Sequence, residues 1–259
     1  MTGQQRPTAA STKRQQSSLP PSGARYRHEI ALLAWLALVA ALLWGFVRIA
    51  DAWFGAGNHG FDEALLLALR NPADLADPIG PHWLEMSARD ITALGGIPVL
   101  ALVTLAACGF LLMLSKRRTT LLLLAAIGGG LLLGTGLKEL FDRPRPELVP
   151  HAVQVATQSF PSSHAMMSAA TYLTLGALLA RTQQRRRLKG YLLAMAVLLT
   201  LLIGTSRVYL GVHWPTDVLA GWWVGAAWAM LCWSVLIRLQ RRGTVERGVE
   251  REDGADPAG

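Results

Sequence analysis

The stretch from Thr119 to Pro146 reads TTLLLLAAIGGGLLLGTGLKELFDRPRP. Its first part, up to Leu137, carries no charged side chain and is long enough to cross ~30 Å of hydrocarbon as a helix. Three cations and two prolines follow directly, namely Lys138, Arg143, Pro144, Arg145 and Pro146. Because the prolines stop the helix from continuing, the stretch predicts a membrane-spanning helix that ends in a constrained basic loop.

Further apolar stretches of similar character lie on both sides of this one. They are found near Ile30 to Ala50, Ile97 to Ser115, Ala165 to Ala180, Leu188 to Gly204 and Val218 to Ile237. The chain is 52% hydrophobic and only 16% charged, which is more apolar than a soluble domain of 259 residues needs. The sequence therefore predicts an all-α integral membrane protein, a bundle of six transmembrane helices. The fourth span is the shortest, and a buried or re-entrant helix is the alternative for it.

The basic residues cluster before the first span, after the second, after the fourth and after the sixth. They are Lys13, Arg14, Arg25, Arg27, Lys116, Arg117, Arg118, Arg185, Arg186, Arg187, Lys189, Arg238, Arg241 and Arg242. Under the positive-inside rule, this pattern predicts that both termini and two basic loops lie in the cytoplasm. A net charge of +8 is thereby explained without a nucleic-acid partner.

The domain organisation follows from the same pattern. Residues 1–24 and 243–259 are polar or charged with little to bury, which predicts disordered cytoplasmic tails. Residues 25–242 form the membrane domain, with an acidic outer loop at 51–96. Short helices are predicted in this loop at Phe61 to Arg70 and at Trp83 to Leu94. Pro72 is expected to stop the first of them.

Two other polar segments border the predicted spans on the outer side. Phe160-Pro-Ser-Ser-His164 has the layout of a helix N-terminus, with Ser162 or Ser163 as the N-cap and free backbone N–H groups that favour an anion. A capped helix with an incidental histidine is the simpler alternative. The basic loop after Leu137, taken alone, also fits a snorkelling anchor.

The second polar segment runs from Ser206 to Asp217 and reads SRVYLGVHWPTD. His213 and Asp217 are four positions apart at a predicted helix start, so the carboxylate is in reach of Nδ1–H and leaves Nε2 free as a nucleophile. A single histidine beside a tryptophan is otherwise common at a membrane interface. Here an arginine, Arg207, lies nearby on the same outer side.

Together the three segments supply the groups that phosphoryl transfer requires. These are three cations, a helix N-terminus and two histidines, of which one has a carboxylate partner: Lys138, Arg145, Arg207, His164, His213 and Asp217. The outer carboxylates are scattered and do not form a metal-ligand cluster. The sequence therefore predicts metal-independent catalysis without a cofactor.

These residues resemble the type 2 phosphatidic acid phosphatase family, whose motifs are KxxxxxxRP, PSGH and SRxxxxxHxxxD. The first motif is matched by Lys138, Arg145 and Pro146, and the third is matched in full. In the second, Ser163 stands where the family usually has glycine. The motifs cover roughly the second half of the chain, and the six-span layout extends the resemblance over most of the rest.

The resemblance implies a role for each matched residue. His213 would be the nucleophile, Asp217 its orienting partner, and His164 the general acid and then the base for water. The phosphate ligands would be Lys138, Arg145, Ser162, Arg207 and the backbone N–H of Ser163. Asp142 and Arg143 fall at variable positions of the first motif and receive no role.

The resemblance also implies a substrate class. The expected substrate is a lipid phosphate or diphosphate such as phosphatidic acid, phosphatidylglycerol phosphate or an isoprenyl diphosphate like undecaprenyl diphosphate. The positive-inside pattern predicts that the site faces the exterior. The compact chain and the lack of retention signals favour a bacterial inner membrane, and our hypothesis for loop 51–96 is that it shapes lipid entry. A lipid phosphotransferase using the same phosphohistidine is one alternative, and an anion or lipid transporter is another.

Overall fold

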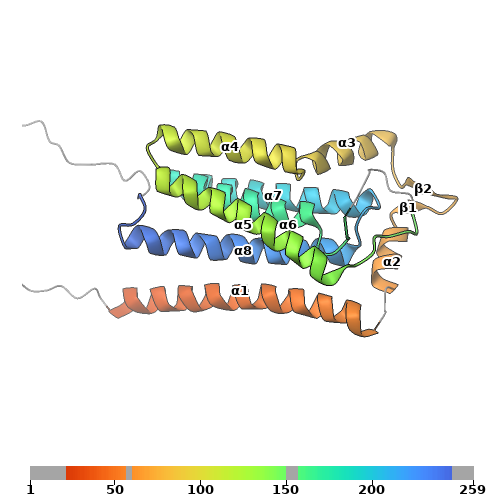
Figure 1. Cartoon of the computed structure of the whole chain (residues 1–259), viewed down its shortest axis with the longest axis horizontal. Helices are drawn as coiled ribbons and strands as arrows, with labels where there is room; N and C mark the ends of the chain where they lie inside the picture. Colours follow the sequence, from red (N-terminus) through yellow and green to blue (C-terminus); the bar gives the residue numbers. More distant parts are fainter. Residues whose placement is uncertain (1–21, 57–59, 150–156, 247–259) are drawn as a thin grey trace, which may run out of the picture. The chain divides into compact units, whose positions relative to one another are not determined.

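The computed structural model describes residues 22–56, 60–149 and 157–246, which are almost entirely helical (Figure 1). The chain divides into two units, Met1–Leu38 and Val39–Gly259, and the described part of the first is the beginning of α1. The elements in chain order are α1 (Ser22–Ala56), α2 (Gly60–Leu67), β1 (Arg70–Asn71), β2 (Asp74–Pro78), α3 (His82–Ala93), α4 (Ile97–Met113), α5 (Arg117–Phe141), α6 (Ser163–Thr182), α7 (Arg186–Tyr209) and α8 (Pro215–Arg241).

Among the described residues, four helices are long and apolar enough to cross a membrane. They are Leu33–Ala52 within α1, and α5, α7 and α8. Helices α3 and α4 are bent by 50° and count as a fifth span if they cross together. The chain is therefore an integral membrane protein with four or five candidate spans, which confirms the predicted architecture at a coarser level than six.

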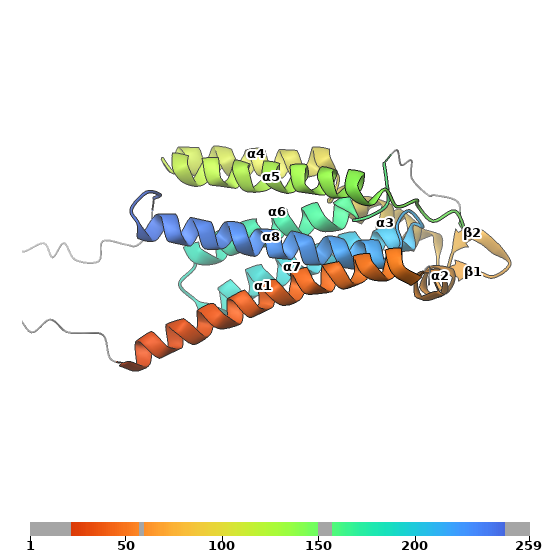
Figure 2. The ribbon, with the colours of Figure 1, turned by 60° about the horizontal axis from the view of Figure 1, so that its bottom comes forward.

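Helix α6 corresponds to the predicted fourth span but does not belong to this apolar group. It lies against α5, α7 and α8 (Figure 2), and half of its residues are buried. Because its neighbours are protein rather than lipid, it is built largely from small and weakly polar residues such as Ala169, Ala170 and Thr174. Its passage across the membrane stays a prediction, as does the side on which the termini lie.

Two glycines let α8 approach the backbone of α6. A Cβ atom at Gly221 would lie 2.7 Å from the carbonyl oxygen of Ser162, and one at Gly225 would lie 2.3 Å from that of Met166. The two glycines, four positions apart, thus serve helix packing. The contact brings the starts of α6 and α8 together, and the N–H of Ser162 donates to the carbonyl of Asp217 at 3.0 Å.

The ends of α5 and α7 and the beginnings of α6 and α8 lie at the same end of the bundle, where α2 is also found (Figure 1). At the other end, the side chain of Arg118 donates to the carbonyl of Thr244 at 2.5 Å, and Arg181 donates to Gln240 at 2.5 Å. The basic loops are therefore gathered at one end and the motif residues at the other.

The outer loop differs in part from the prediction of an all-α chain. The first predicted helix ends at Leu67 rather than Arg70, and β1 and β2 follow as an antiparallel pair in which Asn71 lies opposite Asp74. The Asn71 side chain accepts from the N–H of Ala73 at 3.1 Å across this turn. The chain after Leu67 thus forms a hairpin in place of the last predicted helical turn, while α3 confirms the second predicted helix.

Most of the predicted tails lie outside the described residues. The described chain begins as a helix at Ser22, so the last residues of the predicted N-terminal tail are helical. Residues 243–246 also differ from the expected disorder, because Val245 is buried and Glu246 accepts from the N–H of Thr119 at 3.1 Å. These contacts fasten the end of α8 to the start of α5.

Candidate functional site

The motif residues converge where four helices begin or end. Lys138 lies in the last turn of α5 and Arg207 in that of α7. His164 is in the first turn of α6, and His213 lies two residues before the start of α8, next to its N-cap residue Trp214. The segment between α5 and α6 contributes Arg145. Its end is anchored by Phe160, whose ring lies 4.9 Å from that of Phe141 and 5.6 Å from that of Phe46 between centroids.

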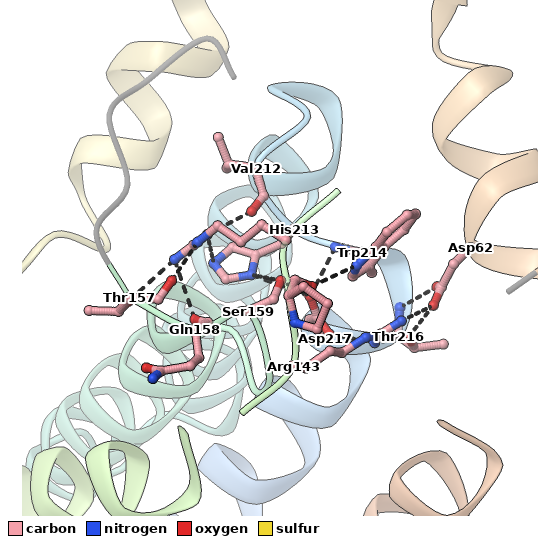
Figure 3. A network of polar contacts seen from close by, with 12 residues as sticks. Asp62, Arg143, Thr157, Gln158, Ser159, Val212, His213, Trp214, Thr216 and Asp217 are labelled. Carbon is pink, nitrogen blue, oxygen red and sulfur yellow. Dashed lines mark hydrogen bonds and ion pairs between the residues drawn. The ribbon is translucent and has the colours of Figure 1, made fainter. Parts of the chain in front are cut away.

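The imidazole of His213 has a different partner at each ring nitrogen (Figure 3). Its Nδ1 lies 3.3 Å from the hydroxyl of Ser159 and 3.5 Å from Oδ2 of Asp217, and its Nε2 lies 3.1 Å from Nη1 of Arg145. A guanidinium can only donate, so this contact requires Nε2 to accept and assigns the proton to Nδ1. The ring thereby presents the lone pair of Nε2 to the cationic side of the site.

The carboxylate of Asp217 is fully buried and is surrounded by donors. Its Oδ2 accepts from the hydroxyl of Ser159 at 2.5 Å and from the N–H of Trp214 at 3.0 Å, while its Oδ1 accepts from Arg143 at 2.5 Å. Ser159 therefore lies beside the predicted His213–Asp217 contact and bonds to the carboxylate directly. The pairing of His213 with Asp217 is present in this form.

Arg143 connects Asp217 to the outer loop. Its side chain is 1% exposed, and Nη2 lies 2.7 Å from Oδ2 of Asp62 in α2. Thr216 completes the connection, because its N–H and hydroxyl donate to Asp62 at 2.9 and 2.6 Å. A continuous buried chain of contacts thus runs from Asp62 through Arg143 and Asp217 to Ser159 and His213 (Figure 3).

Four members of this chain were missed by the sequence reasoning: Asp62, Arg143, Ser159 and Thr216. Arg143 was given no role because it falls at a variable position of its motif. Asp62 lies in the first turn of α2, where acids are common, and it is 81 positions away from Arg143. A single sequence holds no signal that pairs two residues so far apart.

The three predicted cations each donate to the protein and keep further donors. Arg145 donates to the carbonyls of Val212 at 2.6 Å and Thr157 at 2.7 Å. Lys138 is buried and donates to the carbonyl of Gln158. Arg207 is buried and donates to the hydroxyl of Thr92 at 3.1 Å. These bonds to neutral acceptors hold the cations in place without neutralising them.

The start of α6 supplies uncharged donors. Ser162 is the N-cap residue, and its fully buried hydroxyl has no hydrogen-bond partner among the described residues. The first bond of the helix ladder joins the N–H of Met166 to the carbonyl of Ser162, so the N–H groups of Ser163 and His164 have no acceptor within the helix. An unpaired buried hydroxyl beside free N–H groups is typical of a site that receives an anion.

His164 packs against the break between α3 and α4. A Cβ atom at Gly95 would lie 3.2 Å from Cδ2 of the ring, and one at Gly96 would lie 3.9 Å from Nε2. The two glycines thus leave room for the imidazole beside the helix break. The outer loop therefore contacts this histidine through the end of α3.

Both histidines experience the same electrostatic environment. Burial, and then the charges of Arg145, Arg207 and Lys138, hold the pKa of His213 well below its usual value. Burial and the same three cations lower the pKa of His164 to about 3. The charge of His164 also lowers the pKa of His213, so the two rings belong to one electropositive site.

The donor set fits an anion better than a metal ion. Within residues 22–56, 60–149 and 157–246, no group of three or more His, Cys, Asp and Glu side chains is placed to hold a metal. The two carboxylates near His213 are occupied by Arg143 and the hydroxyl donors. Independence from metals stays a prediction.

Comparison with known proteins gives a consistent result. The sequence model of the PAP2 superfamily matches residues 119–241. Phosphatidylglycerophosphatase B of Bacillus subtilis is 39% identical over 95 residues, which are 36% of this chain and 46% of that protein. Undecaprenyl-diphosphatase of Sulfolobus acidocaldarius is 37% identical over 68 residues, which are 26% of this chain and 29% of that protein. The chain thus spans less than half the length of these curated relatives.

Solved structures match over a larger share of this chain. The crystal structure of a transmembrane PAP2 type phosphatidylglycerolphosphate phosphatase from Bacillus subtilis is 30% identical, with a TM-score of 0.70, and the match covers 78% of this chain and 98% of that one. The crystal structure of Aquifex aeolicus LpxE is 24% identical, with a TM-score of 0.51, and covers 66% and 94%. The second similarity supports the fold alone.

Proposed function

This chain belongs to the PAP2 superfamily, and from that membership we propose that it hydrolyses the phosphate ester of a membrane lipid through a phosphohistidine. One observation carries the proposal: Nε2 of His213 faces Arg145 as an acceptor, in a site where three cations act on two neutral imidazoles. The relatives named above act on phosphatidylglycerol phosphate and undecaprenyl diphosphate. A lipid phosphate or diphosphate is accordingly the proposed substrate class, with phosphatidic acid as a further member.

In the proposed complex with substrate, the phosphate lies among the three cations and the free hydrogen-bond donors. Its oxygens are bound by Lys138, Arg145 and Arg207, and by the Ser162 hydroxyl and the Ser163 N–H at the helix start. This use explains why the buried hydroxyl of Ser162 has no partner among the described residues. Charge neutralisation of the equatorial oxygens is the main requirement of phosphoryl transfer.

In the first step, Nε2 of His213 forms a bond to phosphorus while the ester P–O bond breaks. The leaving oxygen takes a proton from His164. In the second step, water attacks phosphorus and gives a proton to His164, and the electron pair of the P–N bond returns to Nε2. The products are inorganic phosphate and the lipid alcohol, or a lipid monophosphate when the substrate is a diphosphate.

His164 must be protonated for the first step, although the surrounding cations favour its neutral form. A bound phosphate anion offsets those cations and raises the pKa of His164 from about 3. Substrate binding therefore recruits the proton that the leaving group needs. Asp217 and Ser159 hold the Nδ1 side of His213 and stabilise the positive charge of the phosphorylated ring.

The proposal places the site on the exterior face of a bacterial inner membrane. The motif residues and the basic loops occupy opposite ends of the bundle (Figure 1), and the positive-inside rule puts the basic end in the cytoplasm. A headgroup can then enter at the outer interface while the lipid tails stay in hydrocarbon. Loop 51–96 would shape this entry.

The test is a phosphate-release assay on purified protein in detergent, with a panel of lipid mono- and diphosphates. We expect turnover that persists in EDTA and is inhibited by vanadate, and we expect His213→Ala to abolish it while the melting temperature is retained. Substrate labelled in the phosphate would separate hydrolysis, which releases free phosphate, from transfer to a second lipid. Undiminished turnover by His213→Ala would refute the nucleophile.

The outer loop permits a separate prediction about lipid entry. Phe61 and Leu65 are exposed apolar residues of α2, whereas Asp62 of the same helix is buried against Arg143. We expect Phe61→Ser with Leu65→Ser to raise KM for a long-chain lipid severalfold and to leave turnover of a short soluble phosphate ester unchanged, because only the lipid tail meets this face. Parallel assays on the two substrates check this, and equal losses on both would contradict it.

A further inference from the structure

A second cleft lies at the end of the bundle opposite the histidines. Its volume is about 310 Å³, and it is lined by residues of α4, α5 and α6 and by the end of α8. Helix α5 reaches both ends, since Thr119 lines the cleft and Lys138 belongs to the histidine site. At ~1.5 Å per residue the two are separated by about 28 Å, close to the thickness of one hydrocarbon core. The cleft thus lies in the opposite leaflet from the histidines.

The wall of the cleft is apolar. Helix α4 contributes Val103, Ala107 and Leu111, and α6 contributes Leu175 and Leu178. At the margin, the side chains of Phe110, Leu114 and Leu179 are about half exposed. In an integral membrane protein, an apolar cleft of this volume fits a hydrocarbon chain.

One end of the cleft is polar and carries unneutralised positive charge. Lys116 lines it, and among the described residues no hydrogen bond or ion pair engages its ammonium group. Arg181 also lines it, donates to Gln240 at 2.5 Å and lies 5.4 Å from the ring centroid of Trp233. Both of these partners are neutral, so the charge of Arg181 is held in place but uncompensated.

Among the described residues that line the cleft, the one acid, Glu246, is already engaged. The carboxylate of Glu246 accepts from the N–H groups of Arg118 at 3.0 Å and Thr119 at 3.1 Å, and from the hydroxyl of Thr119 at 3.2 Å. It caps the start of α5 rather than pairing with Lys116 or Arg181. The polar end of the cleft is therefore suited to an anion.

From this arrangement we propose that the cleft binds one anionic glycerophospholipid, with an acyl chain among the leucines and its phosphate between Lys116 and Arg181. The apolar wall and the cationic end match the two parts of such a lipid. A zwitterionic lipid carries an additional cation, which Lys116 and Arg181 repel. The bound lipid would join α4 to α6, and the site is independent of the histidine site and of the reaction proposed there.

The experiment compares two lipids that differ only in the headgroup. Purified full-length protein in detergent is titrated with phosphatidylglycerol or with phosphatidylcholine of the same acyl chains, and the apparent Kd is taken from the rise in Tm. We expect phosphatidylglycerol to bind at least tenfold more tightly. Lys116→Gln and Arg181→Gln should each weaken it by about fivefold, the effect of about one basic residue near an anionic lipid.

Two further variants keep the result interpretable. Lys189→Gln removes a cation at the start of α7 that does not line the cleft, and it should leave both Kd values unchanged. Ala107→Phe fills the apolar wall, and it should weaken both lipids while phosphate release persists. Persistence of phosphate release also shows that the variants fold.

Several outcomes would overturn the proposal. Equal affinity for the two lipids would mean adventitious occupation by acyl chains, and equal effects of Lys189→Gln and Lys116→Gln would mean a diffuse attraction to the basic end. Glycerol phosphate, which has the headgroup chemistry without chains, can also bind at the histidine site, so its effect on the Tm is compared between the unchanged protein and Lys116→Gln. The two rises in Tm should be equal. A smaller rise in Lys116→Gln would mean that the cleft binds a free anion rather than a lipid.

Discussion

The imidazole of His213 has a polar partner at each ring nitrogen. Asp217, one of these partners, is itself held by the guanidinium of Arg143, which is as deeply buried as the ring. Arg143 bonds to Asp217 on one side and to Asp62 on the other, and all three are nearly inaccessible. A guanidinium between two carboxylates is stable in a buried site because each charge has a partner. Arg143 and Asp62 therefore act as positioning residues for Asp217 and, through it, for His213.

Asp62→Asn tests this positioning role. The substitution keeps the shape of the side chain but removes one of the two charges that face Arg143. We expect the free energy of unfolding to fall by about 3 kcal/mol, as for other broken buried pairs. We also expect kcat to fall by about 100-fold with KM nearly unchanged, because the imidazole of His213, the proposed nucleophile, moves slightly out of its reactive position.

Glu63→Gln is the matched control, since Glu63 is the next residue of α2 and forms no ion pair among the described residues. It should leave both kcat and the unfolding free energy unchanged. Arg143→Lys should retain part of the activity that Arg143→Ala loses. A lysine keeps the positive charge but lacks the two guanidinium N–H groups that contact Asp217 and Asp62. A change confined to KM in Asp62→Asn would argue for a role in lipid entry instead.

The two histidines predict how stability depends on pH. Their pKa values are lowered in the folded protein, that of His164 to about 3 from 6.5, so the unfolded chain binds more protons in this interval. The contribution of the two neutral histidines to the free energy of unfolding is therefore fully present above pH 6.5. It is lost as the pH falls from 6.5 towards 3. Each histidine contributes up to about 1.4 kcal/mol per pH unit.

Thermal unfolding of the substrate-free protein between pH 7 and pH 5 measures this loss. His164→Gln should reduce the slope of Tm against pH in this range, because one of the two titrating groups is removed. Inorganic phosphate should also reduce the slope, since a bound anion raises both pKa values. An unchanged slope in His164→Gln would show that the ring is not held in its neutral form.

At the scale of secondary-structure elements, the contact of α6 with α8 determines where the motif residues lie. Gly225→Ala places a Cβ atom 2.3 Å from the carbonyl oxygen of Met166, so the helices must separate. We expect a loss of about 1–3 kcal/mol in the free energy of unfolding, as for other overpacked sites. Phosphate release should decrease as well, because both histidines depend on this contact.

Gly136→Ala in α5 is the matched control for Gly225→Ala. A Cβ atom at Gly136 meets nothing within 4 Å, and the residue lies inside a helix. The substitution should therefore stabilise the protein by about 0.5–1 kcal/mol, because alanine loses less conformational entropy in a helix. Thermal unfolding of the two variants in one detergent gives opposite shifts if the packing argument holds.

The elements and the site were predictable from the sequence to different degrees. The long apolar runs of α5, α7 and α8 were readable because lipid selects hydrophobic side chains along the whole helix. The grouping of Lys138, His164, Arg207 and His213 was readable because alternate helix ends meet at one side of a membrane. Helix α6 is less apolar than these helices, because it packs against other helices of the protein.

The remaining features depend on tertiary contacts that a sequence does not state. The hairpin of β1 and β2 is too short to show alternation, and Asn71 with Pro72 gives the only local signal for its turn. The bonds from Ser159 and Arg143 to Asp217 are set by how the loop after α5 folds back. Neither residue lies at a position that its motif fixes.

At the scale of the whole molecule, the open question of sidedness can be tested with cysteine labelling. In a chain with Cys108→Ser and Cys232→Ser, the substitution Asp77→Cys introduces a thiol in β2 and Lys189→Cys introduces one near the start of α7. We expect a membrane-impermeant maleimide to label the first variant in intact cells and the second only after lysis. The reverse pattern would place the histidines in the cytoplasm.

The bond from the N–H of Ser162 to the carbonyl of Asp217 joins the chain just before one imidazole to the chain just after the other. The interval between the two rings is thus governed by main-chain atoms and tolerates variation in the side chains around it. Remodelling the hairpin to admit a bulkier lipid would then leave the separation of the two imidazoles unaltered, and with it the proposed path of the phosphoryl group and its proton.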